Sequence, residues 1–161
     1  MTTSPTSSLP TPALVLFDVD YTVLEPGVAF SADGYRATGE RYGLALDTAR
    51  WREAESAAYA VVKRRREELG PVHDDGVYPA VAGAVIDALG GGPPDAVSAC
   101  ADAIVAEWVR VENFALYDDV LPCFERLRAA GVRLGLVSNT SRDLDEIVAA
   151  MERIRDTNFV L

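Results

Sequence analysis

The stretch LVLFDVDYTVL, Leu14 to Leu24, decides the fold class and suggests where the chemistry lies. The apolar run from Ala13 to Phe17 is typical of a strand that is buried on both faces of a parallel sheet. Asp18 follows this run directly, and Asp20 comes two residues later, so both carboxylates can lie on one side of the chain. Because open α/β sheets bind ligands beyond the carboxyl ends of their strands, the two acids predict an active site there.

The residue types in this stretch suit phosphoryl transfer that depends on a magnesium ion. Two ionised carboxylates this close repel each other, and a bound divalent cation would remove the repulsion. Mg²⁺ favours one or two carboxylates together with substrate phosphate, so Asp18 and Asp20 are its candidate ligands. One carboxylate could attack phosphorus while the other exchanges a proton, and the Thr22 hydroxyl could hold the loop. The alternative is an ordinary polar turn from Asp18 to Thr22.

A second strand–helix segment complements the first. The run VRLGLV, residues 132–137, predicts a strand, and helical periodicity follows over residues 144–154. An amphipathic helix is expected just before this strand, over residues 120–127. Ser138 and Asn139 lie between the strand and the last helix. Together with the free N–H groups at the helix start, Ser138 would form a phosphate-binding cradle at a strand end.

The middle of the chain is helical in its periodicity, with helices expected over residues 32–42, 51–69, 81–89 and 94–108. Strands alternating with helices at the two ends imply a parallel sheet, into which the helical block is inserted. We therefore predict an α/β fold with three parts. A core comprises residues 13–26 and 115–161, an all-helical cap covers residues 27–114, and residues 1–12 form a flexible tail.

Composition narrows the classes of function. The chain is 49% hydrophobic with a net charge of −10, which disfavours nucleic-acid and anionic-membrane partners but permits a small phosphorylated substrate. The N-terminus lacks a signal-peptide pattern and no apolar run approaches ~18 residues, so we expect a cytoplasmic protein without a membrane span. Cys100 and Cys123 are predicted as buried free thiols, His73 as a surface or capping residue, and the basic run 63–66 as a helix-end cluster.

Both ends of the chain resemble the haloacid dehalogenase superfamily. LFDVDYTVL is similar to its first signature, and LYDDVLPCFERLRAAGVRLGLVSNTSRD, Leu116 to Asp143, is similar to its second signature with the preceding helix. The helical insert resembles the cap of the subclass that includes phosphoglycolate phosphatase, the haloacid dehalogenases and β-phosphoglucomutase. The resemblance implies a Rossmann-like core and a Mg²⁺-dependent phosphatase that acts on a small phosphorylated metabolite through an aspartyl-phosphate.

The resemblance also assigns roles to individual residues. Asp18 would be the nucleophile and Asp20 the general acid and base, with the Asp18 carboxylate and the Asp20 backbone carbonyl binding Mg²⁺. Ser138, with Asn139 and Thr22, would bind the phosphoryl group. Dehalogenases lack the second acid, because halide leaves without a proton, so Asp20 favours phosphoester over C–halogen hydrolysis.

Two later signatures of the superfamily have no counterpart in the 161 residues. No Lys follows Ser138, and the pattern of the acids after it places them on a helix rather than at a strand end. We therefore expect a C-terminally truncated, incomplete core that is weak or inactive alone. The alternatives are a non-catalytic remnant that binds a partner and a short enzyme completed by a second subunit. Uncovered sheet surface would favour self-association.

Overall fold

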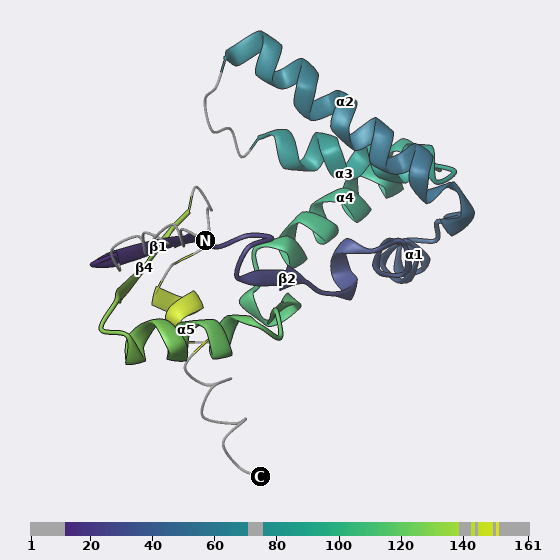
Figure 1. Cartoon of the computed structure of the whole chain (residues 1–161). Coiled ribbons are helices and arrows are strands. Elements are labelled where there is room, and N and C mark those ends of the chain that lie inside the picture. Colours follow the sequence, from purple (N-terminus) through teal and green to yellow (C-terminus); the bar gives the residue numbers. More distant parts are fainter. Residues whose placement is uncertain (1–11, 71–75, 139–142, 144, 150, 152–161) are drawn as a thin grey trace, which may run out of the picture. The chain divides into compact units, whose positions relative to one another are not determined.

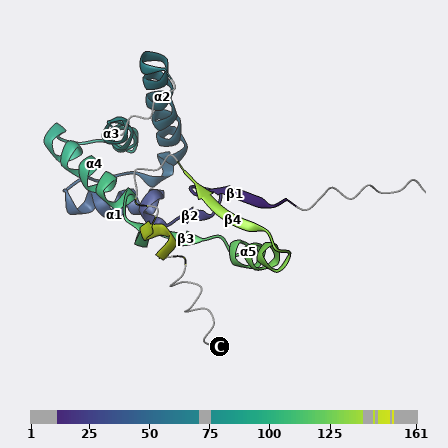
Figure 2. The same cartoon turned by 90° about the vertical axis from the view of Figure 1, so that its left-hand side faces the viewer.

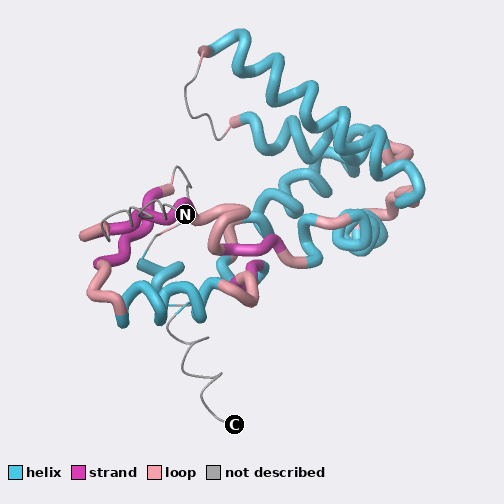
Figure 3. Tube along the Cα trace, viewed as in Figure 1, coloured by secondary structure: helices cyan, strands magenta, loops and turns pink. Residues whose placement is uncertain are grey.

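The computed structural model describes residues 12–70, 76–138, 143, 145–149 and 151. These residues form a mixed α/β structure that is mostly helical and contains a small two-stranded parallel sheet (Figure 3). They divide into two compact units. The sheet unit comprises the described residues of 1–25 and 116–138, and the helical unit those of 26–115 and 139–161. The predicted limits of the core, residues 13–26 and 115–161, and of the cap, residues 27–114, stay predictions.

Two parallel strands form the framework of the sheet unit. β1 (Leu14–Asp18) pairs with β4 (Arg133–Val137) in a register that runs from Leu14 opposite Arg133 to Asp18 opposite Val137. α5 (Val120–Ala129) leads into β4, and Figure 2 shows the two strands side by side with α5 next to them. Both predicted strands and their parallel pairing are therefore confirmed, whereas the assignment of this sheet to an incomplete Rossmann-like core stays a prediction.

A small apolar cluster holds the sheet unit together. The Phe17 ring of β1 packs against the Phe124 ring of α5, with their centroids 4.9 Å apart. Val120, Phe124 and Val132 are buried, so α5 covers one face of the strand pair. Gly131, with φ of 76°, ends this helix in a left-handed conformation that suits glycine, as its position in the sequence indicates.

The prediction that the first strand is buried on both faces is wrong. Exposed and half-buried residues alternate along β1, and the side chains of Leu14 and Leu16 are 44% and 57% exposed. Burial on both faces requires an element packed on each side of the sheet. Among the described residues, β1 has β4 as its one strand partner, and α5 covers the face that carries Phe17.

Over residues 26–115, the helical unit contains four α-helices in the described part of the chain, close to the positions that periodicity predicts (Figure 1). They are α1 (Ala32–Arg41), α2 (Trp51–Leu69), α3 (Val77–Ala88) and α4 (Pro94–Trp108). Short 3-10 helices at Val28–Phe30, Thr48–Arg50 and Val111–Asn113 lie between or beside them. Between residues 27 and 113, every regular element that the structure describes is helical.

Local signals set the ends of these helices. The Ser31 hydroxyl accepts a hydrogen bond from the Gly34 N–H at 3.3 Å and so caps α1. Pro94 occupies the first turn of α4, where its missing N–H costs no helical hydrogen bond. Gly70 stops α2 with φ of 77°. The helix boundaries are therefore properties of the local sequence.

One buried cluster unites the helical unit. α2 packs on α3 and α3 on α4, and their facing side chains form the core together with residues of α1 and of the loops after α1 and α3. Its buried members are Tyr35, Leu44, Leu46, Ala54, Ala82, Val85, Ile86, Leu89, Cys100, Ala101 and Ile104. Trp51 and Trp108 pack against its edge, and the Tyr35 ring lies 5.5 Å from the Trp51 ring.

A second strand pair joins the segment that follows β1 to the segment that precedes α5. β2 (Leu24–Pro26) pairs with β3 (Phe114–Leu116), although neither was predicted from the sequence. Next to this pair, the Gly27 N–H donates to the Asn113 carbonyl at 2.8 Å. Three-residue strands are too short to give a periodic pattern, which explains why the sequence does not indicate them.

The predicted last helix is helical at its described residues, 145–149 and 151. Asp143 begins it, accepting hydrogen bonds from the Asp145 N–H through its carboxylate at 2.8 Å and from the Ile147 N–H through its carbonyl at 3.2 Å. Asp143, Asp145 and Glu146 are exposed, as expected for a solvated face.

Residues 1–11 of the predicted tail, His73 and residues 152–161 lie outside the described residues. None of the described helices is long and apolar enough to cross a membrane.

Candidate active site at the carboxyl ends of β1 and β4

Asp18 and Ser138 lie at the same end of the two-stranded sheet. Asp18 is the last residue of β1 and pairs with Val137, the last residue of β4, and Ser138 follows Val137 in the chain. Neighbouring strands are about 4.8 Å apart, so this register brings the backbones at Asp18 and Ser138 close together although ~120 residues separate them in sequence. Asp18 is exposed and Ser138 is half-buried, which leaves the carboxylate accessible to a ligand.

A tight turn holds the backbone after Asp18. The Val19 carbonyl accepts hydrogen bonds from the N–H groups of Val23 and Leu24, each at 2.9 Å, and a longer one from Thr22 at 3.4 Å. The Tyr21 N–H donates to the Leu24 carbonyl at 2.9 Å. Val19 and Val23 are almost completely buried and anchor the turn in the apolar interior. The polar stretch after the strand is thus a well-bonded turn, not a loose loop.

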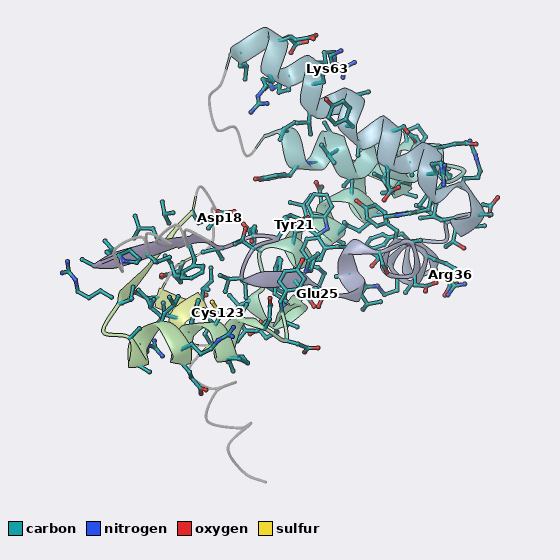
Figure 4. The ribbon with its side chains drawn as sticks, viewed as in Figure 1. Asp18, Tyr21, Glu25, Arg36, Lys63 and Cys123 are labelled. Carbon is teal, nitrogen blue, oxygen red and sulfur yellow. The ribbon has the colours of Figure 1, made fainter. Side chains whose placement is uncertain are left out.

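The Thr22 hydroxyl contacts the proposed nucleophile. Its Oγ1 donates to Oδ2 of Asp18 at 3.3 Å, a long hydrogen bond between two exposed residues (Figure 4 labels Asp18). Such a contact orients one carboxylate oxygen of Asp18. The sequence indicated that Thr22 holds the loop, and the hydrogen bond agrees with that expectation. Its further role in phosphate binding stays a prediction.

Asp20 sits inside the turn and is more enclosed than Asp18. It is half-buried and forms an isolated β-bridge with Leu24. One residue, Val19, separates it from Asp18, and both acids belong to the sheet unit. The turn therefore holds both predicted carboxylates on one short, hydrogen-bonded segment. Asn139, the remaining predicted site residue, lies outside the described residues.

Tyr21 has a backbone conformation that its sequence does not reveal. Its φ is 60°, the only positive value at a non-glycine residue in the described chain, and such a conformation costs a residue with a Cβ roughly 1–2 kcal/mol. No local signal predicts this conformation, because positive φ favours glycine and a tyrosine carries a Cβ. Although much of the Tyr21 surface is exposed, partial desolvation and then the neighbouring Tyr117 phenol raise the pKa of Tyr21. The phenol of Tyr21, which follows Asp20 in the chain, is therefore neutral at physiological pH.

The donor chemistry of this turn fits a magnesium ion. Carboxylate and carbonyl oxygens are the hard ligands that Mg²⁺ prefers, and the ion commonly takes one or two carboxylates and fills the rest of its octahedron with water and substrate phosphate. Asp18 and Asp20 supply that number of carboxylates. Within the described residues, no cluster of three or more His, Cys, Asp or Glu side chains could hold a metal ion entirely through protein side chains.

Other residues that the sequence singled out belong to helices. Cys100 is buried in the helical core, and desolvation raises the pKa of its thiol, an effect that Arg41 partly offsets. Cys123 is also a free thiol, but it is half-buried, so its predicted burial is only partly correct. The basic run lies near the end of α2, where Lys63 and Arg65 form ion pairs with Glu67 at 4.0 Å and Glu68 at 3.7 Å.

The chain matches no protein-family model and no curated protein sequence.

Proposed function

We propose that the chain is a magnesium-dependent phosphatase of the haloacid dehalogenase type that acts on a small phosphorylated metabolite. The observation that carries the proposal is the register of the parallel strands, with Asp18 opposite Val137 and Ser138 next in the chain. A nucleophilic carboxylate and a hydroxyl at adjacent strand ends can engage the same phosphoryl group. The hydrogen bond from Thr22 to Asp18 adds support, because it orients the carboxylate before substrate binds.

The proposed reaction proceeds in two displacements at phosphorus. In the first, an Asp18 oxygen forms a bond to phosphorus, the bond from phosphorus to the ester oxygen breaks, and Asp20 gives its proton to the leaving oxygen. In the second, Asp20 takes a proton from water, the water oxygen bonds to phosphorus, and the bond to Asp18 breaks. Inorganic phosphate leaves, Asp18 is again a free carboxylate, and Asp20 is again protonated.

The remaining groups bind and orient the phosphoryl group. Ser138 would donate its hydroxyl to a phosphoryl oxygen, and Asn139 is the further candidate for this contact. A magnesium ion held by the Asp18 carboxylate and the Asp20 carbonyl would offset negative charge on the phosphate. Residues 139–161 contain no Lys, so no lysine there can add the cation that the resembled family uses. We therefore expect slow turnover from the 161 residues.

Asp20 makes C–halogen hydrolysis the weaker enzymatic alternative, because a departing halide needs no proton.

A non-catalytic binding module is the second candidate function. The observation that favours it is the exposure of Leu14, Leu16 and Val137 on the strand pair. Apolar side chains at such positions could bind a partner.

Hydrolysis of a generic aryl phosphate, measured with Mg²⁺ and with a chelator, tests the proposal. We expect slow, chelator-sensitive turnover and an acid-stable, hydroxylamine-labile phosphoenzyme. Asp18→Asn should lower both by at least about 10³-fold, since an amide is a far poorer nucleophile toward phosphorus. Asp118→Asn is a matched control, because Asp118 is also an exposed acid of the sheet unit but lies outside the turn.

Turnover that persists in Asp18→Asn would refute the assignment of the nucleophile. Turnover that does not respond to the chelator would refute the role of the metal. If neither turnover nor a phosphoenzyme forms in a folded chain, the enzyme proposal fails and the binding module becomes the better description.

A further inference from the structure

α2 carries an exposed stripe of side chains with the spacing of a coiled-coil seam. Counting along the helix, the residues recur at alternating intervals of three and four, which keeps them on one face. We call this set the outer stripe, and its members are Arg52, Glu55, Tyr59, Val62, Arg66 and Leu69. All six are exposed, with Tyr59 at 70% and Val62 and Leu69 at 45% each.

The outer stripe is distinct from the face by which α2 packs in its own unit. That inner face contains Ala54, which is buried, and Trp51 and Ala58, which pack against the helical core. α3 is the main contact of this inner face (Figure 1). A helix that packs in its own unit through one face and exposes a second face with coiled-coil spacing can pair with another helix through that second face.

The outer stripe is symmetric about a point between Ala60 and Val61. Moving outward from that point, Tyr59 mirrors Val62, Glu55 mirrors Arg66 and Arg52 mirrors Leu69. In a two-fold symmetric pair of antiparallel helices, each residue contacts its mirror residue on the other copy. The stripe is therefore complementary to itself: an aromatic ring meets an aliphatic side chain, a carboxylate meets a guanidinium, and the Arg52 stem can cover Leu69.

We propose that α2 binds α2 of a second copy of this chain, antiparallel, through the outer stripe. The charges of the outer stripe indicate both the binding partner, which is a second copy of the chain, and the antiparallel orientation of the two helices. The antiparallel pairing sets Glu55 against Arg66 of the second copy and does so twice in the dimer. A parallel pairing would instead set Glu55 against Glu55 and Arg66 against Arg66, and like charges at a seam disfavour that arrangement.

Contacts beside the outer stripe restrain one of its carboxylates and offset the charges that flank it. The Trp51 indole N–H donates to Oε1 of Glu55 at 3.1 Å, which restrains that carboxylate on the surface. Lys63 and Arg65, which flank the stripe, pair with Glu67 and Glu68 on the same helix, so opposite charges on α2 itself offset these two cations (Figure 4 labels Lys63). Among the charged residues of the stripe, Glu55 and Arg66 then decide which orientation is favourable.

Sedimentation equilibrium of the full chain and of charge-reversed variants tests the proposal. The unchanged chain should dimerise with rising concentration. Glu55→Arg and Arg66→Glu should each weaken dimerisation at least about tenfold, because each puts two like-charged pairs into the interface. Mixing the two variants should restore a dimer, as opposite charges then meet at both sites. The double variant Glu55→Arg, Arg66→Glu should also restore it, because the pair is only exchanged.

Arg64→Glu is the matched control. It makes the same charge change two residues from Arg66 but lies outside the stripe, so dimerisation should be unchanged. Circular dichroism of each variant checks that α2 stays folded, and recovery on mixing is a second check that each single variant is intact. A chain that is monomeric at all concentrations would overturn the proposal, as would equal weakening by Arg64→Glu. Recovery on mixing without recovery in the double variant would show parallel pairing and overturn the orientation.

Discussion

The helical unit and the sheet unit differ in how completely they bury their apolar residues. In the helical unit, one cluster of eleven buried residues links α1, α2, α3 and α4. In the sheet unit, the apolar side chains of Leu14, Leu16 and Val137 are exposed on the parallel strands β1 and β4. The carboxylates that we assign to chemistry lie in the more open unit. Stability and the proposed chemistry are thus concentrated in different parts of the chain, as is common where function requires exposed, less tightly packed elements.

The largest expected difference between the units is in the effect of shortening an apolar side chain. Ile86→Ala empties part of the helical core, where Ile86 is fully buried, and should lower the free energy of unfolding by about 2–5 kcal/mol. Leu16→Ala, at a 57% exposed position on β1, should change it by no more than about 0.5 kcal/mol. Urea denaturation measures both effects.

Fluorescence can separate the two units in this experiment. Both tryptophans, Trp51 and Trp108, belong to the helical unit, so their fluorescence reports its unfolding. Hydrogen exchange at β1 and β4 amides reports the sheet unit. Equal losses in the two variants would contradict the contrast in packing.

The two free cysteines provide a second, smaller contrast. Cys100 is buried in the helical core and its thiol pKa is raised by desolvation, whereas Cys123 on α5 is half-buried. We expect an alkylating reagent to label Cys123 at least about tenfold faster than Cys100, because the reagent reaches Cys100 only when the helical core opens. Mass spectrometry of the labelled peptides measures both rates. Similar rates would mean that the helical core opens as readily as the sheet unit.

The smallest expected effect concerns the turn that carries the two acids. Tyr21 has a positive φ, so Tyr21→Gly should be more stable than Tyr21→Ala by about 1 kcal/mol. Both variants remove the ring, which makes their difference a measure of backbone conformation alone. Ala37→Gly, at an exposed position of α1, is the control and should be destabilising by about 1 kcal/mol. Hydrogen exchange in each unit reports the changes, and an Ala variant at Tyr21 as stable as the Gly variant would refute strain there.

Much of the secondary structure could be predicted because its signals are local. Periodicity located the helices from α1 to α5, and Pro94, Gly70 and Gly131 marked their limits. Apolar runs located β1 and β4. The same rules could not find β2 and β3, which are three residues each, because pairing rather than composition defines such short strands. Nor could they foresee the exposure of Leu14 and Leu16, since burial depends on which elements pack against a strand.

The candidate site was predictable only as a set of residues. The sequence by itself determined that Asp18 and Asp20 follow an apolar strand and that Ser138 follows another, because strand composition and spacing are local properties. Only the tertiary structure decided that Asp18 lies opposite Val137, that Thr22 donates to Asp18, and that the backbone at Tyr21 is left-handed. The register arises from pairing between strands that are distant in sequence, and no local pattern contains that information. The contacts of the turn are local hydrogen bonds, but the residue types alone do not determine which of them form.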